Sequence, residues 1–174
     1  MWINRTTFNY PILIIKISTQ LSTKSIFMKA LIQRVTNAKV NISGKTKGSI
    51  NKGLVVFVGF AENDTNEIIE WVINKIRNLR VFTDQEGKMN NSVEEVKGGL
   101  LIISQFTLYA SVKKGTRPSF IEAAKPELAE SLYNYLLEYV SNNTPLYIES
   151  GKFGADMQVE LTNDGPVTIL VERD

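Results

Sequence analysis

Apolar positions along the chain follow patterns that predict several strands. Residues 29–35 and 38–42 have the composition and alternation of two strands, and residues 43–45 that of a hairpin turn. Residues 53–59 and 100–103 are uninterrupted apolar runs, which is typical of strands covered on both faces.

Two stretches carry the period of a helix. Asp64 followed by Glu67 resembles a capping box, with Asp64 as the N-cap. Behind it, apolar side chains recur at the spacing of one helix face, at Ile68, Ile69, Val72, Ile73, Ile76 and Leu79. Pro126 suits the first turn of a second helix, whose apolar face would consist of Leu128, Leu132, Tyr135, Leu136 and Tyr139.

The remaining pattern completes a single mixed α/β domain. It predicts a short strand near residues 79–82, a loop at 110–118, and two closing strands at 157–161 and 167–172. The order of strands, helix, strands, helix and strands indicates layered β-sheets with two main helices.

The first 27 residues differ from the rest of the chain. They contain three basic side chains and no acidic one, and their apolar run at residues 11–17 is too short to span a bilayer. We interpret residues 1–27 as an N-terminal extension that is disordered or not native, and residues 28–174 as the domain, with a fresh start at Met28. A targeting peptide is the alternative.

Composition removes much of the available chemistry. The 174 residues include no cysteine and no histidine, which excludes thiol nucleophiles, disulfides, Ser-His-Asp catalysis and the usual zinc sites. Outside the extension, 17 basic residues face 18 acidic ones. Contact with a nucleic acid would therefore depend on a local basic patch, because the attraction of the whole molecule is weak.

Three segments are candidates for chemistry, and each also has a plain structural interpretation. Residues 104–108 (Ser-Gln-Phe-Thr-Leu) place polar groups at the end of a buried strand, where they either line a pocket or pair with neighbouring backbone. Residues 163–168 have the composition of a tight turn. Residues 113–120 form a basic loop that either holds phosphates or is simply solvated.

Taken together, these motifs and three others resemble the D-aminoacyl-tRNA deacylase family. The resemblance runs from Met28 to Asp174 and includes residues 28–35, 87–90, 104–108, 117–120, 155–159 and 163–168 in the family's order. Each motif alone is weak evidence, but six in the right order are highly specific.

The resemblance implies a homodimer with active sites at the subunit interface. Ser104, Gln105, Phe106 and Thr107 would form the catalytic segment. The Gly165–Pro166 pair, a cis peptide in the family, would reach into the partner's pocket. Arg34 would hold that loop, and Met157 would join these three as a substrate-binding residue. Lys113, Lys114 and Arg117 would contact tRNA.

The implied activity is hydrolysis of the ester bond of D-aminoacyl-tRNA, a chiral proofreading step that needs no cofactor or metal. A rigid main-chain wall would reject every L side chain by collision and would accept glycine, so glycyl-tRNA(Ala) is a second expected substrate. We expect a cytoplasmic protein that binds neither membrane nor DNA. Either water assisted by the terminal ribose 2′-OH or the Thr107 hydroxyl attacks the ester, and we favour the former.

Three other functions fit parts of the sequence. A hydrolase that edits misacylated L-aminoacyl-tRNA would share the site chemistry. A non-catalytic tRNA-binding protein would need a broad basic face, which the nearly neutral charge of the domain disfavours. A dimeric scaffold would leave the polar end of the apolar strand without a role.

Overall fold

One long strand, β1 (Lys29–Ile42), organises the fold in a computed structural model that describes residues 27–173. Along one edge, β1 pairs antiparallel with β8 (Met157–Glu172). Along the other edge it pairs first with β3 (Gly53–Gly59) and then with β2 (Lys45–Ile50), antiparallel in both cases. The two strands expected at residues 29–35 and 38–42 are therefore the two halves of β1.

Two parallel strands extend the sheet beyond β3. β6 (Gly99–Ser104) pairs with β3, and β7 (Tyr147–Ser150) pairs with β6, which gives the order β2-β1-β3-β6-β7. A separate small hairpin consists of β4 (Phe82–Thr83) and β5 (Met89–Asn91).

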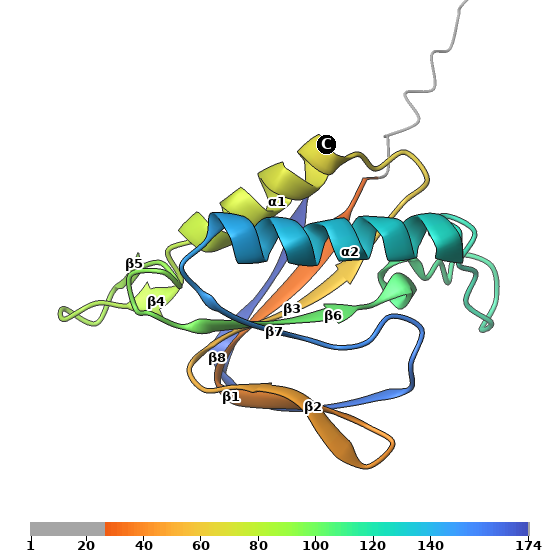
Figure 1. Ribbon diagram of the computed structural model, residues 1–174. Helices are drawn as coiled ribbons and strands as arrows, with labels where there is room; N and C mark the ends of the chain where they lie inside the picture. Colours follow the sequence, from red (N-terminus) through yellow and green to blue (C-terminus); the bar gives the residue numbers. More distant parts are fainter. Residues whose placement is uncertain (1–26, 174) are drawn as a thin grey trace, which may run out of the picture.

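Helices α1 (Asn66–Asn78) and α2 (Pro126–Asn143) cover one face of the sheet (Figure 1). The expected periodicity of α1 is confirmed, since its buried residues are Ile68, Ile69, Val72, Ile73 and Ile76. They pack on alternate residues of the central strands, including Leu54, Val56, Leu100 and Ile102, to form the larger core. Only alternate residues take part because successive side chains of a strand point to opposite faces, so every second one points to the helices.

The opposite face of the central strands has a core of its own. Val55, Leu101 and Ile103 pack against Val40 and Ile50, which come from the second half of β1 and from β2. In Figure 1 this β1–β2 hairpin lies on the side of the sheet away from the helices. The helices, the central strands and the hairpin form three layers, which confirms the expected layered α/β fold.

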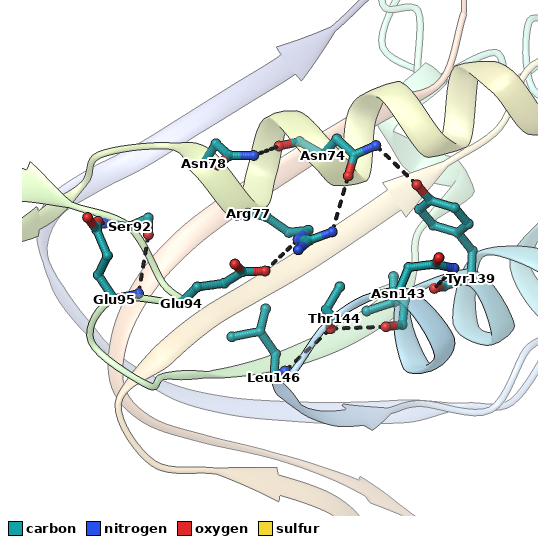
Figure 2. Close-up of polar contacts among 11 residues, drawn as sticks. Asn74, Arg77, Asn78, Ser92, Glu94, Glu95, Tyr139, Asn143, Thr144 and Leu146 are labelled. Carbon is teal, nitrogen blue, oxygen red and sulfur yellow. Dashed lines mark hydrogen bonds and ion pairs between the residues drawn. The ribbon is translucent and has the colours of Figure 1, made fainter.

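Polar contacts join the two helices to each other and to the turn after β5 (Figure 2). Asn74 Nδ2 of α1 donates to the Tyr139 hydroxyl of α2 at 3.1 Å. Arg77 donates to Asn74 Oδ1 at 3.3 Å and pairs with Glu94 at 2.5 Å. These contacts lie at the end of α1 that is away from the 104–107 segment.

The prediction that Asp64 caps α1 is wrong. The N-cap is Thr65, whose side chain makes no capping hydrogen bond. The Asp64 carboxylate instead accepts hydrogen bonds from the backbone N–H groups of Met28 at 2.7 Å and Ala61 at 2.8 Å. A contact with a residue far away in sequence has therefore replaced the local one.

Strand lengths also differ from the sequence-based expectations. The short strand expected at residues 79–82 is reduced to Phe82 and Thr83. The closing strands expected at 157–161 and 167–172 are one strand, β8, and the residues between them bulge out of it. β2 and β7 were not expected, whereas the start of α2 at Pro126 is confirmed.

The extension assigned to residues 1–27 lies outside the described residues, except for Phe27. Phe27 is half-buried and packs against the larger core. Among the helices of the described part, neither combines the length and the apolar character needed to cross a membrane.

Candidate active site

A pocket of about 730 Å³ opens where the central strands end and α2 begins, a volume within the usual range for small-molecule sites. Four stretches of the chain form its wall. They contribute Val58–Phe60, Ile103–Phe106, Phe120 with Ala123–Pro126 and Ala129, and Phe153–Met157 with Val159. The wall is mostly apolar, with Lys125 and Asp156 as its charged residues.

The predicted catalytic segment lies on this wall. Ser104 ends β6, Gln105 follows it, and Phe106 and Thr107 begin the short 3-10 helix η1 (Phe106–Tyr109). The Gln105 N–H donates to Val58 O at 2.6 Å, which fixes the end of β6 against β3. Ser104, Gln105 and Phe106 line the pocket, whereas Thr107 is exposed beside it.

The polar groups of this segment are not consumed by neighbouring backbone. The Gln105 side-chain amide donates to the Thr107 hydroxyl, and within residues 27–173 no side chain of the segment bonds to backbone. In the same range, the backbone N–H groups of Phe106 and Thr107 have no acceptor. The first N–H groups of a helix lack internal partners, so these two are available to a ligand.

The basic loop is attached to the pocket through an aromatic contact. Phe120 lines the pocket and meets Phe106 edge-on, with ring centroids 5.2 Å apart. Two backbone hydrogen bonds between Ser111 and Ser119, at 2.8 and 2.9 Å, close the loop. The loop expected at residues 110–118 contains no helix or strand apart from the isolated bridge at Ser111.

The three predicted tRNA contacts all lie on this loop. Lys113, Lys114 and Arg117 are exposed and lie outside the pocket wall. Because the loop is closed at its base and its next residue is part of the wall, the cations are held near the pocket without entering it.

Arg34 holds the bulge of β8. Between Asn163 and Thr168, β8 has three more residues than the facing stretch of β1. The Arg34 side chain, only 9% exposed, donates from Nε to the Asp164 carbonyl at 3.0 Å and contacts the Asp164 carboxylate at 3.0 Å. It also donates to the Val81 carbonyl. Asn163 Nδ2 in turn donates to the backbone carbonyl of Arg34 at 2.8 Å, so both the side chain and the backbone of Arg34 bind the bulge.

Gly165 and Pro166 form the exposed tip of this bulge, and the peptide bond between them is cis, as the resemblance implies. Of the predicted substrate-binding residues, Met157 lines the pocket, whereas Arg34, Gly165 and Pro166 do not. Within one chain, the structure therefore does not bring the two halves of the predicted site together.

Comparison with known proteins decides the family. Residues 31–172 match the sequence model described as D-Tyr-tRNA(Tyr) deacylase. The chain belongs to this family. It is 53% identical to the D-aminoacyl-tRNA deacylase of Fusobacterium nucleatum subsp. nucleatum over 83% of this chain and 95% of the relative. It is 48% identical to that of Thermosipho melanesiensis over 83% of this chain and 97% of the relative.

Solved structures show the same deacylase fold. A chain described as c-Myc DNA Unwinding Element Binding Protein has 44% identity and a TM-score of 0.79, over 84% of this chain and 99% of that chain. A second, described as a "probable eukaryotic D-amino acid tRNA deacylase", is 18% identical with a TM-score of 0.71 over the same shares and supports the fold alone.

The pocket contains residues that the sequence did not indicate as part of a site. Phe153 and Ala155 come from the turn between β7 and β8, and Ala129 comes from α2. A signal was present in the turn, because Gly151 and Gly154 flank an aromatic residue. A Cβ at Gly151 would lie 2.4 Å from the sulfur of Met157, so this glycine is what allows Met157 to occupy its place.

The candidate site has few ionisable groups. No cysteine or histidine exists in the sequence, so no side chain with an ordinary pKa near neutrality can act there. Within residues 27–173, no three acidic side chains lie close enough together to hold a metal ion. The side chains with charge on the pocket wall are those of Lys125 and Asp156.

Proposed function

We propose that this protein hydrolyses the ester bond of D-aminoacyl-tRNA in the cytoplasm, releasing the free D-amino acid and tRNA, and so proofreads the handedness of amino acids used in translation. Family membership supports a hydrolase of aminoacyl-tRNA esters. The observation that carries the proposal is the 104–107 segment, which presents two unpaired backbone N–H groups beside a pocket large enough for the end of an aminoacyl-tRNA.

The chemistry follows from what the pocket lacks. Without a side-chain base near neutral pH, the terminal ribose 2′-OH of the tRNA is the group best placed to guide an attacking water. Water oxygen adds to the ester carbon, its proton passes through the 2′-OH to the departing 3′-oxygen, and the ester C–O bond breaks. The N–H groups of Phe106 and Thr107 donate to the oxyanion, a contribution worth about 10²–10³ in rate for one donor in other enzymes.

Apolar exposure supports a homodimer. Leu170, 47% exposed, lies beside Leu31 in the ladder between β8 and β1, and Leu31 lies beside Phe57 of β3. The three side chains form a row on the face of the sheet away from the helices, beside the β8 bulge. A second copy covering this row would lie next to the bulge. In a two-fold dimer, the bulge of each subunit then lies against the other subunit.

In this dimer the bulge acts as the chiral filter. The main chain at Gly165 and Pro166 of one subunit closes the partner's pocket where an L side chain would project. Every L-amino acid then collides with backbone, whereas a D-amino acid directs its side chain elsewhere. Glycine has no side chain to collide, so glycyl-tRNA(Ala) is hydrolysed as well.

The tRNA body binds through the basic loop. Lys113, Lys114 and Arg117 contact phosphates, while the pocket holds only the terminal aminoacyl nucleoside. Since the rest of the domain is nearly neutral, affinity depends on these few cations and weakens as salt displaces them.

Parallel assays of D-tyrosyl-tRNA, L-tyrosyl-tRNA and glycyl-tRNA(Ala) test this function. We expect the first and third to be hydrolysed, and L-tyrosyl-tRNA to be released no faster than without enzyme. Equal release of both tyrosines would support an editing hydrolase for L-aminoacyl-tRNA. Binding of tRNA without turnover of any ester would support a non-catalytic binding protein.

Arg34→Lys is expected to lower kcat/KM for D-tyrosyl-tRNA about tenfold, because lysine cannot reproduce the fork of contacts to Asp164 and Val81 and a hydrogen bond to a charged group contributes about 1.5–3 kcal/mol. The ratio of D- to L-tyrosyl-tRNA turnover should fall too, because the bulge is less firmly held. Rates with both substrates check this prediction.

Arg77→Lys is the matched control for Arg34→Lys. Arg77 is likewise an arginine paired with an acid, Glu94, but it is less deeply buried and joins α1 to the turn after β5 (Figure 2). It should destabilise the protein without changing the ratio of D to L turnover. An equal change of that ratio in both variants would make Arg34 a residue for stability only.

A further inference from the structure

A buried carboxylate at the start of β1 has no role in the proposed reaction. Asp64 is only 7% exposed, and its two oxygens accept the backbone N–H groups of Met28 and Ala61 at 2.7 and 2.8 Å. Burial raises the pKa of this carboxyl group, although the two hydrogen bonds oppose the shift. A carboxylate removed from water is costly unless a cation balances it.

The described residues offer Asp64 no cation. Within residues 27–173, no lysine or arginine pairs with it. Lys29, which follows Met28 in the chain, contacts Glu172 at 3.5 Å and the Tyr109 ring instead. What Asp64 does contact is one particular atom, the backbone nitrogen of Met28. That nitrogen belongs to a residue whose side chain is fully buried in the larger core.

The likeness to known relatives leaves most residues before Met28 unmatched. Nearly whole relatives, 95% and 97% of their lengths, match only 83% of this chain, and the family model begins matching at residue 31. A solved chain matches 84% of this chain with 99% of its own length. The fold therefore exists as an independent unit without a counterpart of most residues that precede Met28.

We propose that the Asp64 carboxylate is a binding site for the α-ammonium group of a chain whose translation begins at Met28. In such a chain the Met28 nitrogen carries a positive charge and three hydrogens in place of one. One hydrogen stays on the carboxylate oxygen 2.7 Å away. The Tyr109 hydroxyl donates to the carbonyl of Phe27 at 2.6 Å, and in such a chain this partner is absent.

The charge pair changes how stability depends on pH. The ammonium pKa is about 7.7–8.0 in an unfolded chain and rises when the group pairs with Asp64. Its contribution is then fully present below the unfolded pKa and is lost as pH rises through the folded pKa. A peptide nitrogen at residue 28 does not titrate, so the stability of a longer chain does not show this decrease as pH rises. Tyr109, Lys29, Glu122 and Glu172 also lie nearby, but they are present in both chains.

Three proteins separate the charge from everything else: the 1–174 chain, the 28–174 chain with a free amino group, and the 28–174 chain acetylated at that group. The acetyl group retains an amide N–H and a carbonyl and removes only the charge. At pH 7 we expect the unfolding constant of the free-amino chain, measured in urea, to be about tenfold smaller than that of the acetylated chain, which corresponds to one pKa unit. At about pH 10.5 the difference should disappear.

Substitution of Asp64 gives an independent check. Asp64→Asn should increase the unfolding constant more in the free-amino chain than in the acetylated one. Asp84→Asn is the matched control, since the Asp84 carboxylate also accepts two backbone N–H groups, at 2.8 and 2.9 Å, but lies in the β4–β5 hairpin. Its effect should be the same in all three proteins. If the Asp64→Asn variant does not fold, the stability of the unsubstituted free-amino and acetylated chains still tests the proposal.

Two results would overturn the proposal. Equal stability of the free-amino and acetylated chains at pH 7 would show that Asp64 does not bind the ammonium group. A product of the natural gene whose intact mass begins only at Met1 would show that translation does not start at Met28. Deacylation is measured separately, so neither result depends on the proposed function.

Discussion

D-Tyrosyl-tRNA that ends in 2′-deoxyadenosine is expected to be hydrolysed about 10²–10⁴-fold more slowly than the ribose form, the usual contribution of a proton-transferring group. Thr107→Ala should stay within about threefold of the parent rate, because an unassisted hydroxyl is a weak nucleophile. The physical reason is that the pocket wall contains no histidine or cysteine that could act as a base near neutral pH, whereas the 2′-oxygen lies next to the reacting ester. Single-turnover rates with the amino acid attached at the 3′ position test both the effect of the deoxy substrate and that of Thr107→Ala.

Binding must be separated from chemistry in this test. The deoxy substrate should compete with the ribose form at similar concentrations, since one hydroxyl contributes little to the affinity of a tRNA. Gln105→Ala, which removes the donor to the Thr107 hydroxyl, should resemble Thr107→Ala. Loss of activity in Thr107→Ala together with full activity on the deoxy substrate would make Thr107 the nucleophile.

Gly53→Ala is expected to destabilise the protein by more than about 4 kcal/mol or to prevent folding. A Cβ at this position would lie 2.0 Å from the carbonyl oxygen and 2.7 Å from the nitrogen of Gly99. Both atoms belong to the backbone where the parallel strands β3 and β6 begin, so neither can move without breaking the ladder. Urea unfolding, or the yield of folded protein by circular dichroism, measures the loss.

Gly44→Ala is the control for that substitution. Gly44 has a positive φ of 76° in the β1–β2 turn, and nothing lies within 4 Å of its added Cβ. The substitution should lower the free energy of unfolding only by the amount that a non-glycine residue with a left-handed backbone costs, about 1–2 kcal/mol. A similar cost for both substitutions would mean that β3 and β6 separate easily at Gly53.

Strands that carry the core could be predicted from the sequence, and those held by their neighbours could not. β3 is an apolar run whose pattern depends only on burial on both faces. β2 is polar along most of its length, and only Gly48 and Ile50 are buried, so its pairing depends on β1. β7 is similarly short and half-exposed, and it forms because β6 offers it a free edge.

Contacts across the sequence explain the local errors. Asp64 and Thr65 are both good N-cap residues, and local propensity favours neither strongly. The Met28 N–H, 36 residues away, binds Asp64 and leaves the cap to Thr65. The composition at 163–168 is that of a turn, but the pairing of β8 with β1 on both sides turns it into a bulge.

The candidate site was predictable where polar residues follow a buried strand. Ser104 and Gln105 stand out because a hydroxyl and an amide end an apolar run, and both line the pocket together with Phe106. Phe153 and Ala129 do not stand out, because apolar residues in a turn and on a helix resemble ordinary core. Only the folding of α2 and the β7–β8 turn over the end of β6 makes them part of the wall.

The position of the bulge inside β8 has a consequence for how the protein fails. Both ends of the bulge are held in the ladder with β1, the strand that also pairs with β2 and β3, so the Gly165–Pro166 tip has no hinge of its own. Large excursions of the tip require partial opening of the central sheet. In the proposed dimer, where this tip rejects L side chains, accuracy is therefore coupled to the stability of the sheet. Heat or a destabilising change in the sheet is then expected to raise the rate of cleavage of L-aminoacyl-tRNA before it abolishes cleavage altogether.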